Sequence, residues 1–295
     1  MPASTPKHYR PETRLVHAGT LRSQFGETSE ALFLTQGYVY ETALQAERRF
    51  KNEEPGYQYS RFSNPTVTMF EQRMASLEGA EAARATATGM AAVTTALMGQ
   101  VKAGDHVVAS KQLFGSCRYV VEDHLPRYGV TSTLVDGTSL DQWKQAVGPN
   151  TKTFFLESPT NPTLDVLDIK AIAEIAHAAG ATLVVDNVFS TPLYQHPLEL
   201  GADCVVYSAT KHIDGQGRCL GGVILASEKF IQDNVHNLIR QTGPSISPFN
   251  AWVLLKGLET LAVRVQRQTD SAATVAVALT DNPKIPRLIL SLIHI

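Results

Sequence analysis

The sequence predicts an α/β protein built on a mostly parallel sheet that helices cover on both faces. Short apolar runs recur along the chain, among them HVVA at 106–109, TLVVD at 182–186 and CVVY at 204–207. Between them lie segments with helical periodicity, of which the clearest spans 167–179 and stops at Gly180. Because neighbouring parallel strands need crossover helices, this alternation indicates parallel pairing.

The composition is that of an ordinary globular protein of 295 residues, 43% hydrophobic and 18% charged, with a formal net charge of -2. No basic run marks a nucleic-acid or membrane partner, so a small, soluble substrate is expected. The three cysteines show neither zinc-ligand spacing nor a disulfide framework, and the N-terminus lacks the apolar region of a secretion signal. We therefore expect a cytoplasmic protein without a metal site.

Residues 1–60 are predicted to form an arm rather than a domain, because the segment is polar, weakly periodic and carries prolines at 2, 6 and 11. The stretch 32–50 could hold a short helix. At the end of the arm, Tyr59 and Arg61 precede the capping string Asn-Pro-Thr of a helix predicted over 67–77. This pair either binds an anion or is an ordinary aromatic beside a surface arginine.

The next two segments predict helices that begin with small or aromatic residues. EAARATATGMAAVTTALMGQ at 81–100 predicts a turn at Gly89 and a helix over 90–98. Such a helix start lets backbone N–H groups approach a phosphate, although close helix packing explains the small residues equally well. A further helix is predicted over 112–127, in which Phe114 either stacks on a bound ring or belongs to the core.

Further strands are predicted over 131–135, 153–156 and 222–226, with a helix over 140–147. The string ESPTNP follows the strand at 153–156 and places polar side chains at its carboxyl end. A helix over 249–261 that continues through 264–279 leaves the sheet. We place a domain boundary near Lys256, which divides the chain into an arm (1–60), a large domain (61–256) and the start of a C-terminal domain (257–295).

The chain is organised around Lys211, which follows the strand at 204–207 in the string SATKHIDG. Pyridoxal 5'-phosphate (PLP) needs a lysine for its aldehyde, donors for its phosphate and an acid for its ring nitrogen. Ser208 and Thr210 could supply the donors, and Asp186 the acid. Both strands end where open α/β sheets bind ligands. The alternative interpretation of Lys211 is a solvated loop lysine.

Two other classes of protein fit less well. The glycines at 215, 217 and 221 miss the dinucleotide-binding pattern by one position, and no Gly-Lys dipeptide exists for a P-loop. A cofactor-free, non-catalytic assembly subunit would have no reason to gather Asn161, Asp186 and Lys211 at strand exits.

Five motifs in order, YSRFSNPT, ATGMAA, ESPTNP, VVDN and YSATKHIDG, resemble the Cys/Met-metabolism (trans-sulfuration) family of PLP-dependent enzymes. The resemblance covers residues 12–289. Within the family, QLFGSCRYVVEDHLPRYGV is most similar to the O-succinylhomoserine sulfhydrylase branch. The resemblance implies the aspartate-aminotransferase-like, type I fold of PLP-dependent transferases.

The resemblance also implies a role for each candidate residue around the cofactor ring. Lys211 would bond covalently to PLP, and Asp186 would pair with the ring nitrogen. Phe114 stands where most of the family has tyrosine; it can still stack on the ring but has no hydroxyl, so Lys211 must carry more of the proton transfer. Asn161 matches the family asparagine near the 3'-oxygen of the cofactor and the substrate carboxylate.

The cofactor phosphate would be bound from two subunits. In one subunit the resemblance implies four groups, which are the backbone of Gly89 and Met90 and the hydroxyls of Ser208 and Thr210. Tyr59 and Arg61 would reach the phosphate of the neighbouring subunit's cofactor. This sharing implies a homodimer and, by family habit, a homotetramer.

The implied reaction is a γ-replacement in which O-succinylhomoserine and sulfide give homocysteine and succinate in methionine biosynthesis, with Lys211 removing the Cα proton. Other members of the family are methionine γ-lyases and cystathionine synthases or lyases, which remain alternatives. Methionine-cleaving lyases usually carry cysteine directly after the glycine that Gly115 matches. This chain has Ser116 there, which favours the synthetic reaction.

Finally, the resemblance implies that the chain stops early in its C-terminal domain. The family arginine that binds the substrate carboxylate lies in the missing part, so the 295-residue chain is expected to be inactive alone. Residues 290–295, LSLIHI, are expected to be non-native, because they match one reading frame of a common sequencing adapter.

Overall fold

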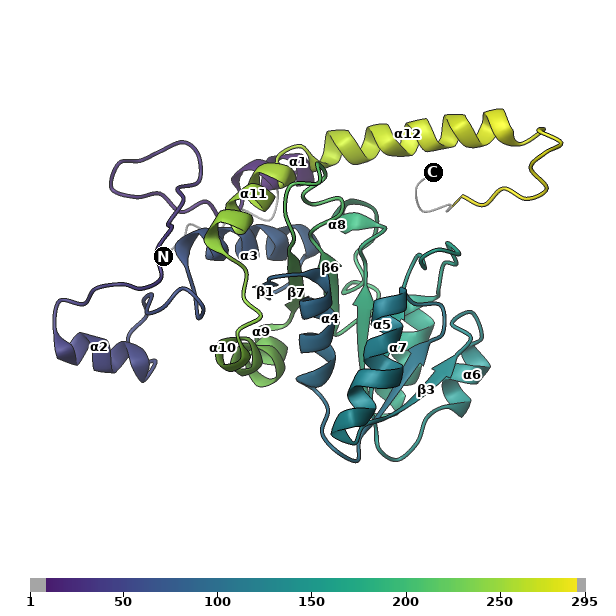
Figure 1. Ribbon diagram of the computed structural model, residues 1–295, viewed down its shortest axis with the longest axis horizontal. Helices are drawn as coiled ribbons and strands as arrows, with labels where there is room; N and C mark the ends of the chain where they lie inside the picture. Colours follow the sequence, from purple (N-terminus) through teal and green to yellow (C-terminus); the bar gives the residue numbers. More distant parts are fainter. Residues whose placement is uncertain (1–8, 291–295) are drawn as a thin grey trace.

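A computed structural model describes residues 9–290 of the chain (Figure 1). Residues 291–295, which belong to the stretch expected to be non-native, lie outside the described residues. The described residues form one seven-stranded sheet in the order β1-β7-β6-β5-β4-β2-β3. Its strands are β1 (Ala82–Thr86), β2 (His106–Ser110), β3 (Thr131–Val135), β4 (Thr151–Glu157), β5 (Thr182–Asp186), β6 (Cys204–Ser208) and β7 (Gly222–Ala226).

The predicted mostly parallel α/β fold is confirmed. Strands β3, β2, β4, β5 and β6 pair in parallel, and only β7 runs antiparallel to both of its neighbours within the described sheet. Because β6 and β7 are antiparallel neighbours, the segment between them leaves and re-enters the sheet at the same end, which is the carboxyl end of β6. That segment carries Lys211.

The helices bracket the sheet and extend beyond it at both ends of the chain (Figure 1). They are α1 (Pro11–His17), α2 (Ala43–Phe50), α3 (Pro65–Glu78), α4 (Gly89–Met98), α5 (Gly115–Tyr119), the π-helical turn η1 (Val120–His124), the 3-10 turn η2 (Leu125–Tyr128), α6 (Leu140–Gln145), α7 (Ile169–Ala178), α8 (Thr191–Tyr194), α9 (Glu228–Phe230), the π-helical turn η3 (Ile231–His236), α10 (Asn237–Thr242), α11 (Pro248–Leu258) and α12 (Leu261–Leu279).

Several helix ends follow from local sequence. The Asn64 side chain accepts a hydrogen bond from the Thr66 N–H at 2.9 Å and Pro65 takes the first helical position, so α3 starts where the Asn-Pro-Thr string predicts. Asp168 caps α7 through the Ala171 N–H at 3.0 Å. The helix then stops before Gly180, whose φ of +69° suits glycine.

Among the elements that differ from the sequence prediction, three have a clear physical reason. Strand β1, AARAT, was not predicted, because it contains none of the β-branched or aromatic runs that mark the other strands. The helix predicted over 112–127 is divided into α5, η1 and η2, with a proline at 126 that has no N–H to donate. The helix predicted from 249 to 279 is broken at Glu259 and Thr260 into α11 and α12.

Two apolar layers sandwich the sheet, and each strand contributes alternate side chains to them. On β5, Leu183 and Val185 pack in the layer that contains α3, α7 and α11, whereas Val184 packs in the layer that contains α4. The alternation follows from the two-residue repeat of a strand. A sheet buried on both faces is what parallel pairing predicts.

Candidate functional site

Three neighbouring strands each end in a polar side chain on one face of the sheet. Glu157, Asp186 and Ser208 are the last residues of β4, β5 and β6. The residue two positions earlier in each strand packs in the layer beside α4, and these residues are Phe155, Val184 and Val206. Side chains two residues apart point the same way, so the three polar groups also face the α4 side.

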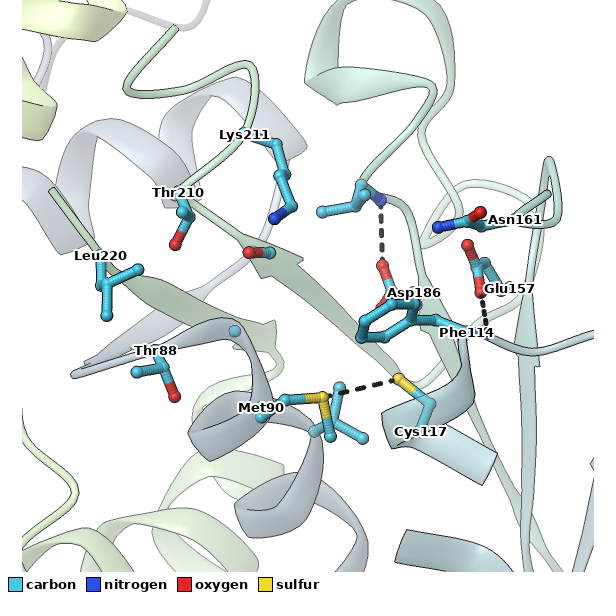
Figure 2. Close-up of a pocket in the computed structure, with 14 residues that line it drawn as sticks. Thr88, Met90, Phe114, Cys117, Glu157, Asn161, Asp186, Thr210, Lys211 and Leu220 are labelled. Carbon is cyan, nitrogen blue, oxygen red and sulfur yellow. Dashed lines mark hydrogen bonds between the residues drawn. The ribbon is translucent and has the colours of Figure 1, made fainter. Parts of the chain in front are cut away.

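A cavity of about 210 Å³ lies at this edge, between the strand ends and the start of α4 (Figure 2). It gathers most of the residues predicted from the sequence, namely Gly89, Met90, Phe114, Asn161, Asp186, Ser208, Thr210 and Lys211. They come from five separate segments of the chain. The structure therefore brings together residues that are up to 122 positions apart, from 89 to 211.

Lys211 enters the cavity from the segment that follows β6. Its backbone is fixed on both sides, because its N–H donates to the Ser208 carbonyl at 3.2 Å and its carbonyl accepts from the Gly215 N–H at 2.8 Å. Figure 2 shows the side chain extending into the site. Among residues 9–290, no hydrogen bond or ion pair engages the amine, which leaves it available to an aldehyde.

Asp186 is nearly buried, with 8% of its surface exposed, and one carboxylate oxygen accepts the Val188 N–H at 3.0 Å. Burial raises the pKa of this carboxyl above its usual value, while the Val188 N–H opposes the rise. A protonated ring nitrogen would provide the opposite charge that the buried carboxylate lacks. Asp186 therefore fits the acid that a PLP ring needs.

Glu157 is a second buried carboxyl in the cavity, and sequence analysis assigned it no role. It stands opposite Asp186 in the pairing of β4 with β5, and it accepts the Phe114 N–H at 2.8 Å. Burial and then the charge of Asp186 raise the pKa of Glu157, while the hydrogen bond from the Phe114 N–H opposes the rise. The sequence did contain a signal for Glu157, because this carboxylate ends β4, the strand that precedes TLVVD in the chain.

The first turn of α4 is built to receive an anion. The Thr88 side chain caps the helix by accepting the Ala91 N–H at 3.0 Å. No acceptor within residues 9–290 pairs with the N–H groups of Gly89 and Met90, and both residues line the cavity. Together with the hydroxyls of Ser208 and Thr210, these groups suit a phosphate at a helix N-terminus.

Gly89 is needed for the close approach of α4 to β6. A Cβ atom at this position would lie 2.5 Å from the Ser208 Cβ and 2.7 Å from its Oγ, which is closer than real contacts allow. The glycine therefore allows the start of α4 and the Ser208 hydroxyl to lie close together at the wall of the cavity. The first turn of α4 and the hydroxyls of Ser208 and Thr210 form an anion cradle, and a phosphate group fits this cradle.

We expect Gly89→Ala to weaken PLP binding by about tenfold or more, because overpacking costs about 1–3 kcal/mol and would push α4 away from Ser208. The measurement is an absorbance titration of the cofactor-free chain with PLP. Gly115→Ala is the matched control, since a Cβ there meets nothing within 4 Å, and its dissociation constant should change less than about twofold. Equal dissociation constants for the two variants would contradict the role given to Gly89.

Phe114 lies at the mouth of the cavity with 45% of its surface exposed, immediately before α5. Figure 2 shows its ring on the cavity side, near Asp186 and Asn161. An exposed ring held by its backbone N–H on Glu157 is not a core residue. Its placement suits stacking on a planar ligand.

Tyr59 and Arg61 lie outside the cavity that gathers the other candidates. The Arg61 guanidinium lies 5.2 Å from the centre of the Tyr59 ring and 4.9 Å from that of Phe62, and it donates to the Arg240 carbonyl. Within one chain these residues form a separate aromatic and cationic cluster.

Several cavity residues were not singled out by sequence analysis. Besides Glu157, they are Thr88, Val93, Cys117, Val188 and Leu220. The Cys117 thiol is buried, and burial followed by the charges of Asp186 and Glu157 raises its pKa well above the usual value. Within residues 9–290 no cluster of three or more histidine, cysteine or acidic side chains could hold a metal, and no helix has the length and apolarity to span a membrane.

Comparison with protein families finds a match to the Cys/Met metabolism PLP-dependent enzyme family over residues 12–292. The chain is 52% identical to an O-succinylhomoserine sulfhydrylase of Mycobacterium tuberculosis, over 96% of this chain and 70% of that protein. It is 49% identical to an O-succinylhomoserine sulfhydrylase of Pseudomonas aeruginosa, over 94% and 68%. An L-methionine gamma-lyase of Porphyromonas gingivalis is 41% identical, over 92% and 69%.

Two solved structures share the fold, each with a TM-score of 0.89. One is a chain from Campylobacter jejuni that contains N'-pyridoxyl-lysine-5'-monophosphate; it is 30% identical, over 94% of this chain and 76% of that one. The other is metB from Corynebacterium glutamicum, 31% identical, over 96% and 72%. Fold and lysine-bearing cavity together define a PLP-dependent enzyme. The chain belongs to the Cys/Met metabolism PLP-dependent enzyme family, as its motifs predicted.

Proposed function

We propose that the protein catalyses γ-replacement on O-succinylhomoserine with sulfide, giving homocysteine and succinate in the cytoplasm. The observation that carries the proposal is the 52% and 49% identity to two O-succinylhomoserine sulfhydrylases over nearly the whole of this chain. The cavity supports it, since it combines a free lysine, a buried acid and an anion cradle at one sheet edge. Ser116 after Gly115 also favours the synthetic reaction over methionine cleavage.

Different residues of the cavity are assigned to bind different parts of PLP. We assign the covalent bond with the cofactor aldehyde to Lys211, the ring nitrogen to Asp186 and the ring face to Phe114. The phosphate is assigned to the first turn of α4, Ser208 and Thr210. Asn161, which lines the same cavity, is assigned to the cofactor's 3'-oxygen and the substrate carboxylate.

When bound, PLP supplies an electron sink for the charge that develops at the substrate Cα. The residues of this chain must then transfer the protons. The Lys211 amine, as free base, is the group we assign to remove the Cα proton, because Phe114 has no hydroxyl and no other amine lines the cavity in the described part of the chain. Asp186 and Glu157 are both buried, so their carboxyl groups have little contact with water.

We further propose a homodimer or homotetramer in which Tyr59 and Arg61 of one subunit bind the cofactor phosphate of its neighbour. Two features support this: both residues lie outside their own cavity, and α2 in the same arm buries none of its residues in the described chain. Figure 1 shows α2 lying away from the sheet. The division into an arm (1–60), a large domain (61–256) and the start of a C-terminal domain (257–295) is part of the same proposal.

One assay tests the reaction. The chain spans 70% of the Mycobacterium tuberculosis relative, so the assay uses the 295-residue chain and a chimera that continues from Ile289 with the remainder of that relative. We expect homocysteine from O-succinylhomoserine and sulfide with the chimera, and none with the shorter chain. Formation of 2-oxobutanoate from methionine or cystathionine, without a sulfide-dependent product, would instead indicate a lyase. The 41% identity to a methionine gamma-lyase makes this the second candidate.

A further inference from the structure

The segment between β6 and β7 holds Lys211 through a compact set of backbone contacts. The Asp214 N–H donates to the Ala209 carbonyl at 2.9 Å, and the Asp214 carboxylate is fully buried. That carboxylate accepts the Arg218 N–H at 2.8 Å and its guanidinium Nε at 3.0 Å. These contacts close the segment on itself. They do not fix it against the rest of the protein.

Arg264, one turn into α12, supplies that outer attachment. Its Nη1 donates to the His212 carbonyl at 2.9 Å, directly after Lys211. Its Nη2 donates to the Gly257 carbonyl at 2.8 Å, at the end of α11. Its Nε donates to the Thr260 hydroxyl at 3.1 Å, at the start of α12. One guanidinium therefore joins two helix ends to the residue beside Lys211.

The backbone wraps closely around this guanidinium. Gly215 has a φ of +67°, and a Cβ there would lie 1.9 Å from the Arg264 Nη1. Gly257 approaches the segment from the other side, where a Cβ would lie 2.2 Å from the Ile213 carbonyl oxygen. A side chain at Gly215 would therefore collide with the Arg264 guanidinium, and one at Gly257 would collide with the backbone of the segment that follows Lys211.

We propose that Arg264 is a positioning residue for Lys211, which it holds in register with the cavity by binding the carbonyls next to it from α12. The inference rests on the cofactor-binding part of the proposed function and is independent of which substrate is used. Charged donors bind carbonyls more strongly than neutral ones, and a guanidinium presents five N–H donors in a fixed fork, so one side chain can reach three acceptors in different directions. Without it, the His212 and Ile213 carbonyls lose their hydrogen bonds to α12.

The test compares Arg264→Met with Arg267→Met in the full 295-residue chain. Arg267 is the matched control, because it lies on the same helix, is exposed and carries the same charge. Each variant is mixed with PLP and quenched with borohydride at successive times, and mass spectrometry measures the labelled fraction of the peptide that contains Lys211. The pH midpoint of the absorbance band of the cofactor–lysine bond is recorded in parallel.

We expect Arg264→Met to label Lys211 about 10- to 100-fold more slowly than the native chain and to shift the pH midpoint, since small misplacements of a reacting group have effects of this size. Arg267→Met should match the native chain. Methylguanidinium at millimolar concentration should partly restore labelling to Arg264→Ala. A purely structural arginine would lower the thermal midpoint and leave the rate and the pH midpoint of folded protein unchanged, and that result would overturn the inference.

Amide hydrogen exchange on the cofactor-free chain separates this inference from the assignment of Lys211. If the native chain does not label at Lys211, the cofactor role proposed for that lysine fails, but exchange at residues 212–216 still reports on Arg264. Faster exchange at residues 212–216 in Arg264→Met than in Arg267→Met would support the inference that Arg264 fixes this segment. Equal exchange in the two variants would overturn it.

Discussion

Lys211→Ala is expected to abolish covalent attachment of PLP and to reduce turnover by about 10²–10⁴-fold from loss of the general base alone. Lys211 is the only amine that lines the cavity within the described residues, so no neighbouring group can replace it. Borohydride treatment followed by peptide mass spectrometry measures the attachment, and homocysteine release by the chimera measures turnover.

Lys170→Ala is the control, because Lys170 is an exposed lysine on α7 that does not line the cavity. It should label and turn over like the native protein. A Lys211→Ala protein that still carries the reduced cofactor on the peptide spanning residue 211, or that retains native turnover, would show that the cavity lysine has been assigned wrongly.

Arg73→Met is expected to destabilise the protein by about 3–5 kcal/mol, the usual cost of leaving one partner of a buried ion pair alone. Arg73 on α3 is fully buried, pairs with Glu30 and donates from Nε to the Ala18 carbonyl at 2.9 Å. Lys256 on α11 binds the other Glu30 oxygen at 2.5 Å. Glu30 thus ties the N-terminal segment to two helices, and urea denaturation measures the loss.

Lys51→Met is the matched control, since the pair of Lys51 with Glu47 is exposed and should contribute less than about 0.5 kcal/mol. The double variant Arg73→Met, Glu30→Met should recover part of the loss, because it removes the uncompensated charge. Equal unfolding free energies for Arg73→Met and Lys51→Met would disprove the role of the buried pair.

The same pair predicts a pH dependence of stability. Burial raises the pKa of Glu30, but the hydrogen bond from Lys256 and the charge of Arg73 outweigh it and lower the pKa from 4.5 to about 2. A folded pKa below the unfolded one gives stability that is fully present above pH 4.5 and is lost as the pH falls toward 2. Glu30→Gln should remove this part of the acid dependence.

The sequence predicted those parts of the fold that depend on local pattern. The apolar strands and capped helices were found because period-two and period-3.6 runs bury one or both faces of an element. Strand β1 was missed because AARAT is extended through its pairing with β7. That pairing is a long-range contact, and the side chains of AARAT show no pattern that predicts it. The break between α11 and α12 follows from tertiary packing around Thr260 and Gly257 in the same way.

The candidate site was predictable where a residue ends a strand or starts a helix. Asp186, Ser208 and Gly89 carry such local signals, and the sheet order then brings them together. Glu157 has the same local signal, but its importance depends on its pairing with Asp186, which only the register reveals. Arg264 had no signal at all, because its partners are backbone carbonyls more than fifty positions away at His212 and Ile213.

The shared face of Glu157, Asp186 and Ser208 also constrains how this chain can evolve. Substitutions inside β4, β5 or β6 change one side chain, whereas inserting or deleting a single residue there reverses the parity of every later position up to the strand end. Deleting one residue of β5 would turn Asp186 toward the opposite apolar layer and bring Asn187 to the cavity. Length variation among descendants of this chain should therefore accumulate in the connections and the N-terminal segment, while these three strands keep a fixed number of residues.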